Sequence, residues 1–192
     1  MKKTDIKTNP APAKETTTAR GEIYEWIQCL IIALIVCVLI FVFLFRLVDV
    51  VGDSMNPTLE NGDKMVVSNL FYTPKQGDIV IFRKDDYKET ALVKRVIATE
   101  GQTVEIDFYR GEVYVDGVLL DEPYIAEPTR NQIDFKGAMV VPEGCVFVMG
   151  DNRNNSTDSR DSRIGMVDTR MIIGKVMFTV FPFNHAGSPY GD

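Results

Sequence analysis

The chain of 192 residues has few of the side chains on which most hydrolases and metalloproteins depend. It contains one histidine, His185, and three cysteines, of which Cys29 and Cys37 lie within one long apolar run. A Ser-His-Asp triad would have to recruit His185 from the polar tail, and one histidine with one cysteine outside the run is too few ligands for a zinc site. We therefore expect no metal, no cofactor and no intramolecular disulfide, and we interpret Cys145 and His185 as a packing residue and a tail residue.

Several recognition motifs are also missing. Neither G-x-x-x-x-G-K-[ST] nor G-x-G-x-x-G occurs, and the S-x-x-K of penicillin-binding proteins is absent. Basic residues are not in excess, because the net charge is -6 and residues 47–192 hold 23 of the 27 acidic but only 15 of the 21 basic residues. We therefore expect neither a phosphate-cradling loop nor a nucleic acid partner.

What the sequence does have is an apolar run of membrane-spanning length. Residues 27–45 carry no charge, and as a helix they would extend about 29 Å, close to the hydrocarbon thickness of a bilayer. A cleaved signal peptide fits poorly, because its apolar run typically has about 7–15 residues. We predict a transmembrane helix at residues 23–46, which makes the lipid bilayer a partner.

The flanks of this run predict its orientation. Basic residues gather before it, and one follows it closely: Lys2, Lys3, Lys7, Lys14 and Arg20, then Arg46. Because cytoplasmic flanks are enriched in Lys and Arg, we predict a single-pass plasma-membrane protein with a cytoplasmic N-terminus. Residues 1–22 have too few large apolar residues to fold and should form a disordered cytoplasmic tail, and residues 47–192 an extracytoplasmic domain.

The outer segment has the pattern of a β-domain. Short runs rich in Val, Ile, Phe and Tyr alternate with Gly, Pro, Asn and Asp. The clearest predicted strands are Lys64–Val67, Asp78–Phe82, Ala91–Thr99, Gln102–Phe108, Glu112–Val115, Val118–Leu120, Cys145–Met149 and Ile172–Phe181. Asp116-Gly117 predicts a hairpin with a type I′ turn, and residues 56–62 could form one helical turn that Asn56 caps.

A polar segment at residues 150–161 allows more than one interpretation. It resembles a calcium-binding loop, but Arg153 stands where an oxygen ligand should be. Asn154 and Asn155 each begin a glycosylation sequon, which matters only in an organism that glycosylates exported proteins. By composition alone, the segment is a solvated connection.

Lys94 is a candidate general base. In a strand it shares a face with Leu92 and Val96, whereas Arg95 points the other way. Desolvation disfavours the ammonium form, and a neutral amine can activate a serine hydroxyl without any histidine. The alternative is a lysine that extends its charged end to solvent from the sheet rim.

Ser54 is the best candidate nucleophile. It precedes a turn that contains Pro57, where the hydroxyl can be exposed and backbone N–H groups can stabilise an oxyanion. The alternative is a simple turn residue. Ser54 is nine residues beyond Phe45, so an extended chain places it at most about 30–32 Å from the predicted span.

Four motifs together resemble those of bacterial type I signal peptidases, the membrane-anchored Ser/Lys proteases that remove signal peptides from exported preproteins. The motifs are residues 52–59 (GDSMNPTL), 77–82 (GDIVIF), 93–97 (VKRVI) and 149–160 (MGDNRNNSTDSR). They occur in the order and spacing of the family, and the resemblance covers residues 23 to about 183. The match is to the single-span form of Gram-positive type.

The resemblance implies roles for individual residues. Ser54 would be the nucleophile and Lys94 the general base, with Ser156 hydrogen-bonding the lysine amine and Asp158 supporting that loop. The backbone N–H of Ser54 would be one oxyanion donor. Gly52 stands where the Gram-negative form has a serine that supplies the second donor, so a glycine amide or water must substitute.

The resemblance also implies a fold and a substrate. It predicts a mostly β protein, with an antiparallel β-barrel or coiled-sheet catalytic domain after one transmembrane helix. Secretory preproteins would bind as an added strand, with two shallow pockets for small side chains. We expect Val51, Met55, Pro57 and Val66 to contribute to substrate binding.

Two other functions deserve comparison. A membrane-anchored β-domain could bind extracytoplasmic peptides without cleaving them, with Ser54 as a turn residue and Lys94 at the rim. A repressor-type self-cleaving protease shares the Ser/Lys dyad, but it would lack a membrane span and would carry a DNA-binding helical region. The four motifs favour the signal peptidase.

Overall fold

The computed structural model describes residues 19–84 and 87–191. The chain divides into two compact units, one up to Phe41 and one from Val42 onward. The first unit holds most of helix α1 (Ala19–Leu44), in which Gly21–Leu39 is long and apolar enough to cross a membrane and is not buried by the protein. This helix covers most of the predicted span at residues 23–46, but it begins at Ala19, within the predicted tail, and ends at Leu44; residues 1–18 of that tail lie outside the described residues.

The second unit is built from antiparallel strands and one short 3-10 helix, η1 (Thr169–Met171). The strands are β1 (Arg46–Asp49), β2 (Lys64–Ser68), β3 (Ile79–Lys84), β4 (Lys88–Thr99), β5 (Thr103–Asp107), β6 (Glu112–Val115), β7 (Val118–Leu119), β8 (Met139–Val140), β9 (Cys145–Met149), β10 (Val167–Asp168) and β11 (Ile172–Phe181). All eight predicted strands are present, and the prediction missed β1, β8 and β10.

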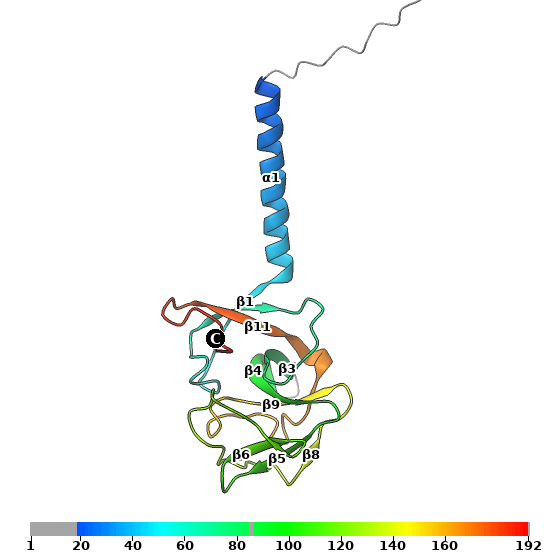
Figure 1. Cartoon of the computed structure of the whole chain (residues 1–192), viewed down its shortest axis with the longest axis vertical. Coiled ribbons are helices and arrows are strands. Elements are labelled where there is room, and N and C mark those ends of the chain that lie inside the picture. Colours follow the sequence, from blue (N-terminus) through cyan, green and yellow to red (C-terminus); the bar gives the residue numbers. More distant parts are fainter. Residues whose placement is uncertain (1–18, 85–86, 192) are drawn as a thin grey trace, which may run out of the picture. The chain divides into compact units, whose positions relative to one another are not determined.

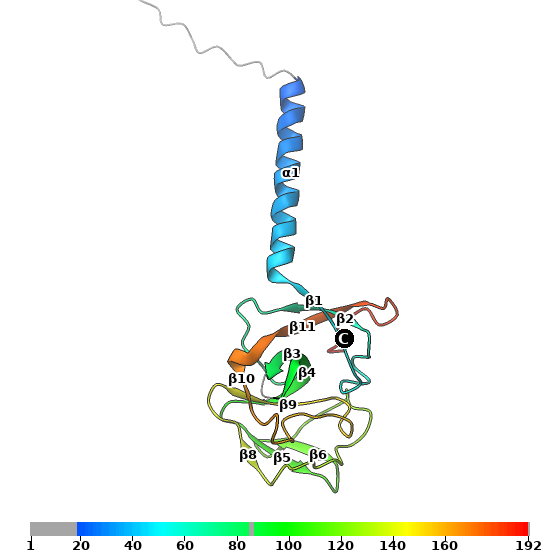
Figure 2. The same ribbon diagram turned by 180° about the vertical axis from the view of Figure 1, so that it is seen from behind.

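The strands form two sheets. A seven-stranded sheet has the order β1-β2-β11-β3-β4-β9-β10, and a four-stranded sheet has the order β7-β6-β5-β8. Figures 1 and 2 show the smaller sheet at one end of this unit, with β1 and β11 at the other end and β3, β4 and β9 between them. This confirms the predicted mostly antiparallel fold, although no closed barrel forms among the described strands.

Two local predictions about turns have different outcomes. The hairpin at Asp116-Gly117 is confirmed, because both residues have positive φ and Val115 pairs with Val118. Residues 56–62 form turns and not a capped helix. Leu59 N–H donates to the Met55 carbonyl at 3.0 Å, so this turn begins at Met55, one residue before the predicted cap.

Three apolar clusters hold the second unit together. One joins the two sheets, with Val104 and Val113 on the smaller sheet packed against residues such as Phe147 on β9. The other two cover opposite faces of the larger sheet. One of them, which we call the apolar wall, consists of Val50, Met55, Leu59, Met65, Val67, Ile79, Ile81 and Val176. It positions the segment between β1 and β2.

Candidate active site

The segment between β1 and β2 carries Ser54 and is closed at its base by backbone hydrogen bonds. Val50 N–H donates to the Asp63 carbonyl at 2.8 Å, and Gly62 N–H donates to the Val50 carbonyl at 2.9 Å. The two ends of the segment are therefore fixed to each other, and Ser54 projects from a closed loop.

Apolar packing fixes the loop from within. Met55 and Leu59 are almost completely buried in the apolar wall, so the residue before Met55 is held at the protein surface. Gly52 has φ +97°, a conformation that favours glycine, and its N–H donates to Asn61 Oδ1 at 2.9 Å. The sequence therefore fixes the backbone on both sides of Ser54.

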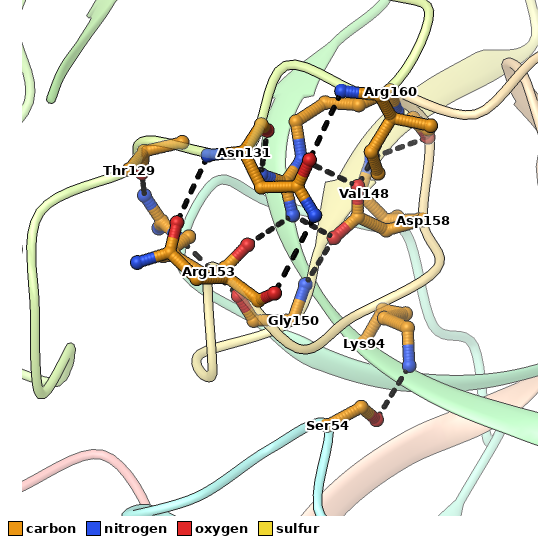
Figure 3. A network of polar contacts seen from close by, with 12 residues as sticks. Ser54, Lys94, Thr129, Asn131, Val148, Gly150, Arg153, Asp158 and Arg160 are labelled. Carbon is orange, nitrogen blue, oxygen red and sulfur yellow. Dashed lines mark hydrogen bonds and ion pairs between the residues drawn. The ribbon is translucent and has the colours of Figure 1, made fainter. Parts of the chain in front are cut away.

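Lys94 lies on β4 and meets this loop. Its side chain is 2% exposed, and its Nζ atom is hydrogen-bonded to Ser54 Oγ at 2.7 Å and to the Val93 carbonyl at 2.9 Å. Figure 3 shows the amine and the hydroxyl pointing toward each other. Burial disfavours the ammonium form of a lysine, and this geometry is within reach for proton transfer. Of the two interpretations of Lys94, an exposed rim lysine is wrong.

The segment from Gly150 to Asp161 is mostly buried, so its interpretation as a solvated connection is wrong. Arg160 donates from Nε and Nη2 to the two oxygens of Asp158, each at 2.8 Å, and both side chains are inaccessible to solvent. Gly150 N–H donates to Asp158 Oδ2 at 3.0 Å (Figure 3). These bidentate bonds stiffen the segment and compensate the buried charges of Asp158 and Arg160.

The same segment touches the candidate nucleophile, Ser54, directly. Asn152 N–H donates to the Ser54 carbonyl at 3.1 Å, and Asn152 Nδ2 donates to the Asp53 carbonyl at 3.0 Å. A methyl group added at Gly150 would overlap both the Ser54 carbonyl oxygen and Ser156 Oγ. Ser156 therefore packs close to the Ser54 backbone. Its hydroxyl is buried without a hydrogen-bond partner among the described residues, so the expected hydrogen bond to the lysine amine is not formed in this structure. The role of Ser156 in catalysis stays a prediction.

A second buried ion pair connects the two sides. Arg95 follows the candidate base and donates to both oxygens of Asp151, from Nε at 2.9 Å and from Nη2 at 2.6 Å. Thr58 donates to the same carboxylate at 2.6 Å, and the Arg95 guanidinium stacks over the Tyr124 ring. This pair joins β4, the loop between β1 and β2 that carries Ser54, and the segment from Gly150 to Asp161.

A third pair lies behind the polar segment. Arg153 donates to Glu122 from both terminal nitrogens and to the Gly150 carbonyl from Nε at 3.1 Å. Burial acts to lower the pKa of Arg153, but its hydrogen bonds to Glu122 reverse this and raise the pKa overall. We call residues 150–161 with these three ion pairs the polar wall. Sequence reasoning missed Gly150, Arg95 and Glu122, although acids and arginines that alternate in a short segment were a usable signal.

A groove runs from Ser54 and Lys94 along two strand edges that have no partner among the described strands. On one side β1 pairs with β2 alone within this set, and on the other β4 pairs with β9 from Arg95 onward, so residues 90–94 have a free edge. Between these edges lies a cavity of about 460 Å³. Its walls come from residues 48–52, from Ser54 and Met55, from Ile81 and Arg83, and from residues 90–94.

The residues predicted to bind substrate lie in different places. Val51 and Met55 line the cavity, Val51 being 87% exposed and Met55 buried. Pro57 and Val66 do not line it. The reason for Val66 is strand alternation, because its neighbours on β2 face the apolar wall and its own side chain points to the opposite face. Among the described residues, no group of three or more His, Cys, Asp or Glu side chains could hold a metal.

Comparisons with known proteins agree with one another. The family described as "Signal peptidase, peptidase S26" matches residues 23–181. Signal peptidase I of Bacillus licheniformis is 37% identical over 182 residues, which cover 89% of this chain and 95% of that protein. A probable signal peptidase I-1 of Synechocystis is 41% identical over 175 residues, which cover 86% of each. A signal peptidase I from Enterococcus faecalis, known from its crystal structure, is 31% identical in sequence. The match covers 54% of this chain and 97% of that chain, with a TM-score of 0.45.

Proposed function

The chain belongs to the S26 family of signal peptidases, which are serine proteases, and we propose that it uses Ser54 as nucleophile and Lys94 as general base to release signal peptides from translocated preproteins. The observation that carries this proposal is the 2.7 Å hydrogen bond between a surface serine and a lysine amine that is 2% exposed. Helix α1 would anchor the enzyme in the plasma membrane, with the N-terminus cytoplasmic and residues 47–192 outside.

The proposed chemistry needs only the two side chains and water. The Lys94 amine takes the hydroxyl proton as Ser54 Oγ attacks the scissile carbonyl carbon, and the resulting ammonium returns that proton to the leaving amine. Water then attacks the acyl-enzyme ester, again with the amine as base, and this releases the signal peptide and the free hydroxyl. The bond to the Val93 carbonyl holds the amine in place for both steps.

Stabilisation of the oxyanion would begin with the backbone N–H of Ser54. The family resemblance predicts a glycine amide or a water molecule as the second hydrogen-bond donor to the oxyanion. The Gly52 N–H already donates to Asn61, and the Gly150 N–H to Asp158. We therefore propose water as the second donor.

The groove suits an extended peptide. A substrate strand between the free edges of β1 and β4 would add main-chain hydrogen bonds to both, which tolerate varied sequences. Val51 and Met55 at the dyad end would contact small side chains next to the scissile bond. The two edges also explain why the larger sheet can stay open, since the substrate would fill the gap.

The alternative function, peptide binding without cleavage, requires no contact between Ser54 and Lys94. A test is to incubate the full chain in detergent with a signal-bearing precursor and to map the cut by mass spectrometry. Lys94→Arg keeps the charge but cannot deprotonate near neutral pH, and Ser54→Ala removes the nucleophile, so each should abolish turnover while the fold remains intact. Processing by either variant at the wild-type rate would refute the assignment of that residue.

A further inference from the structure

At the end of the groove away from Ser54 lies an arginine that the chemistry does not use. Arg83 is on β3, two residues beyond Ile81, and both residues belong to the lining of the same cavity. It lines the cavity and is exposed. No hydrogen bond or ion pair engages its guanidinium within the described part of the chain.

The register of the sheet sets the distance of Arg83 from the dyad. Val80 pairs with Lys94 and Phe82 with Leu92, so Arg83 lies three residues along the strand from the level of Lys94. At roughly 3.3 Å per residue this separation is about 10 Å. The pairing of β3 with β4 is irregular between Phe82 and Lys84, next to Arg83. Irregularities of this kind change the direction in which nearby side chains point.

The other charged groups in the cavity leave this end positive. They are Lys94, which is buried in the dyad, and Asp49, whose carboxylate is 2.7 Å from Lys64 Nζ. Lys64 compensates the charge of Asp49, whereas no such compensation is found for Arg83 among the described side chains. Among the described residues that line the cavity, a peptide would therefore meet an uncompensated positive charge at Arg83.

The direction of the chain indicates which part of a substrate reaches Arg83. Asp49 comes five residues after the end of α1, and the chain then runs along the groove to Ser54. If α1 is the membrane anchor, as the proposed function requires, the chain passes through residues 48–52 of the cavity lining on its way from the bilayer to Ser54. The apolar part of a signal peptide also lies in the bilayer, so the residues before the scissile bond should lie beside residues 48–52, in the cavity that Arg83 also lines.

We propose that Arg83 selects precursors by the charge they carry about four to six residues before the scissile bond, a range that follows from the strand spacing and the length of the side chain. A carboxylate at this distance is attracted by the guanidinium, and a lysine or arginine is repelled. This inference rests on the proposed function and adds a specificity residue to it. Because the site is exposed, the preference is modest, up to about five-fold for each change of charge.

A matched set of precursors tests the proposal. The set keeps alanine at the first and third positions before the bond and carries Asp, Ser or Lys at the fifth. We expect the full chain in detergent to have the highest kcat/KM for Asp and the lowest for Lys, and Arg83→Gln to remove this order. Arg83→Glu should reverse it, and high salt should weaken it.

Lys84→Gln is the matched control, since it removes the same charge from the neighbouring residue, which does not line the cavity. It should keep the wild-type order of substrates. If Arg83→Gln cleaves all three precursors with the wild-type ratios, the role of Arg83 is refuted and the proposed function stands. If the wild-type chain cleaves none of them, the proposed function itself fails.

Discussion

The apolar wall and the polar wall meet beside Ser54 and Lys94, the proposed catalytic side chains, but they hold the loop that carries Ser54 by different means. The apolar wall buries Met55 and Leu59 and so fixes the nucleophile loop by packing. The polar wall fixes the Ser54 carbonyl through Asn152 and surrounds it with ion pairs. Packing is non-directional and tolerates changes of shape, whereas a buried ion pair tolerates almost none, because each group depends on its partner. The two walls should therefore respond to mutation very differently.

The largest expected effect is at Gly150, where the polar wall packs against the backbone of Ser54. In Gly150→Ala the new methyl group overlaps the Ser54 carbonyl and Ser156 Oγ, so one of them must move. A displacement of about 1 Å at a reacting group can cost about 100-fold in rate. We therefore expect kcat/KM for a precursor to fall by about 100-fold.

Gly21→Ala is the control for this experiment, since Gly21 has no atom within 4 Å of an added methyl group and no positive φ. It should retain full activity. If Gly150→Ala has the same activity as Gly21→Ala, the polar wall accommodates an added methyl group as easily as an apolar core does.

The next effect is on stability and comes from Asp158. Asp158→Asn leaves the Arg160 guanidinium buried without its carboxylate, and breaking a buried pair in this way costs about 3–5 kcal/mol. Urea unfolding followed by circular dichroism measures this loss. Loss of less than about 1 kcal/mol would show that solvent reaches the pair.

The same measurement on the apolar wall should give a smaller value. Leu59 is completely buried, but Leu59→Met keeps nearly the same volume and adapts its shape, so we expect a cost below about 1.5 kcal/mol and nearly full activity. A cost as large as that of Asp158→Asn would remove the distinction between the two walls.

Much of the apolar wall was predictable from the sequence, because strand alternation reports directly on burial. The residue patterns of β2, β3, β4 and β11 identify four of the five strands that contribute to it or border it; the fifth is β1, whose Val48 packs against it. The short strands β1, β8 and β10 were missed, since two to four residues are too few to show a period, whereas the equally short β6 and β7 are marked by the Asp116-Gly117 turn between them. Val66 is close in sequence to the motifs, which predicts a place in the substrate pocket. Strand alternation instead points its side chain to the opposite face of the sheet.

The polar wall was predictable only through the family resemblance. Composition alone indicates a solvated loop, because burial of an arginine depends on partners that are distant in sequence. Glu122 is 31 residues from Arg153, and the Arg95 partner Asp151 is 56 residues away. No local pattern contains such contacts, so a sequence can suggest the charges but not their burial.

Three Asp-x-Arg pairs near the polar wall provide the finest comparison, because the spacing of acid and arginine is the same in each and burial is not. Both partners are buried in Asp158–Arg160, only the acid is buried in Asp161–Arg163, and in Asp168–Arg170 the exposed fractions of the side chains are 25% and 88%. Mutation of each acid to asparagine should therefore cost progressively less.

The smallest expected effect is that of Asp168→Asn. Its hydrogen bond to Arg170 lowers the pKa of Asp168 to about 2, so any stabilisation is present above the ordinary pKa of an aspartate and is lost as the pH falls toward 2. Since solvent screens this exposed pair, we expect unfolding midpoints indistinguishable from wild type at pH 7, whereas Asp161→Asn should lose about 1 kcal/mol. Equal losses for Asp168→Asn and Asp158→Asn would mean that the local Asp-x-Arg turn, and not burial, gives the polar wall its rigidity.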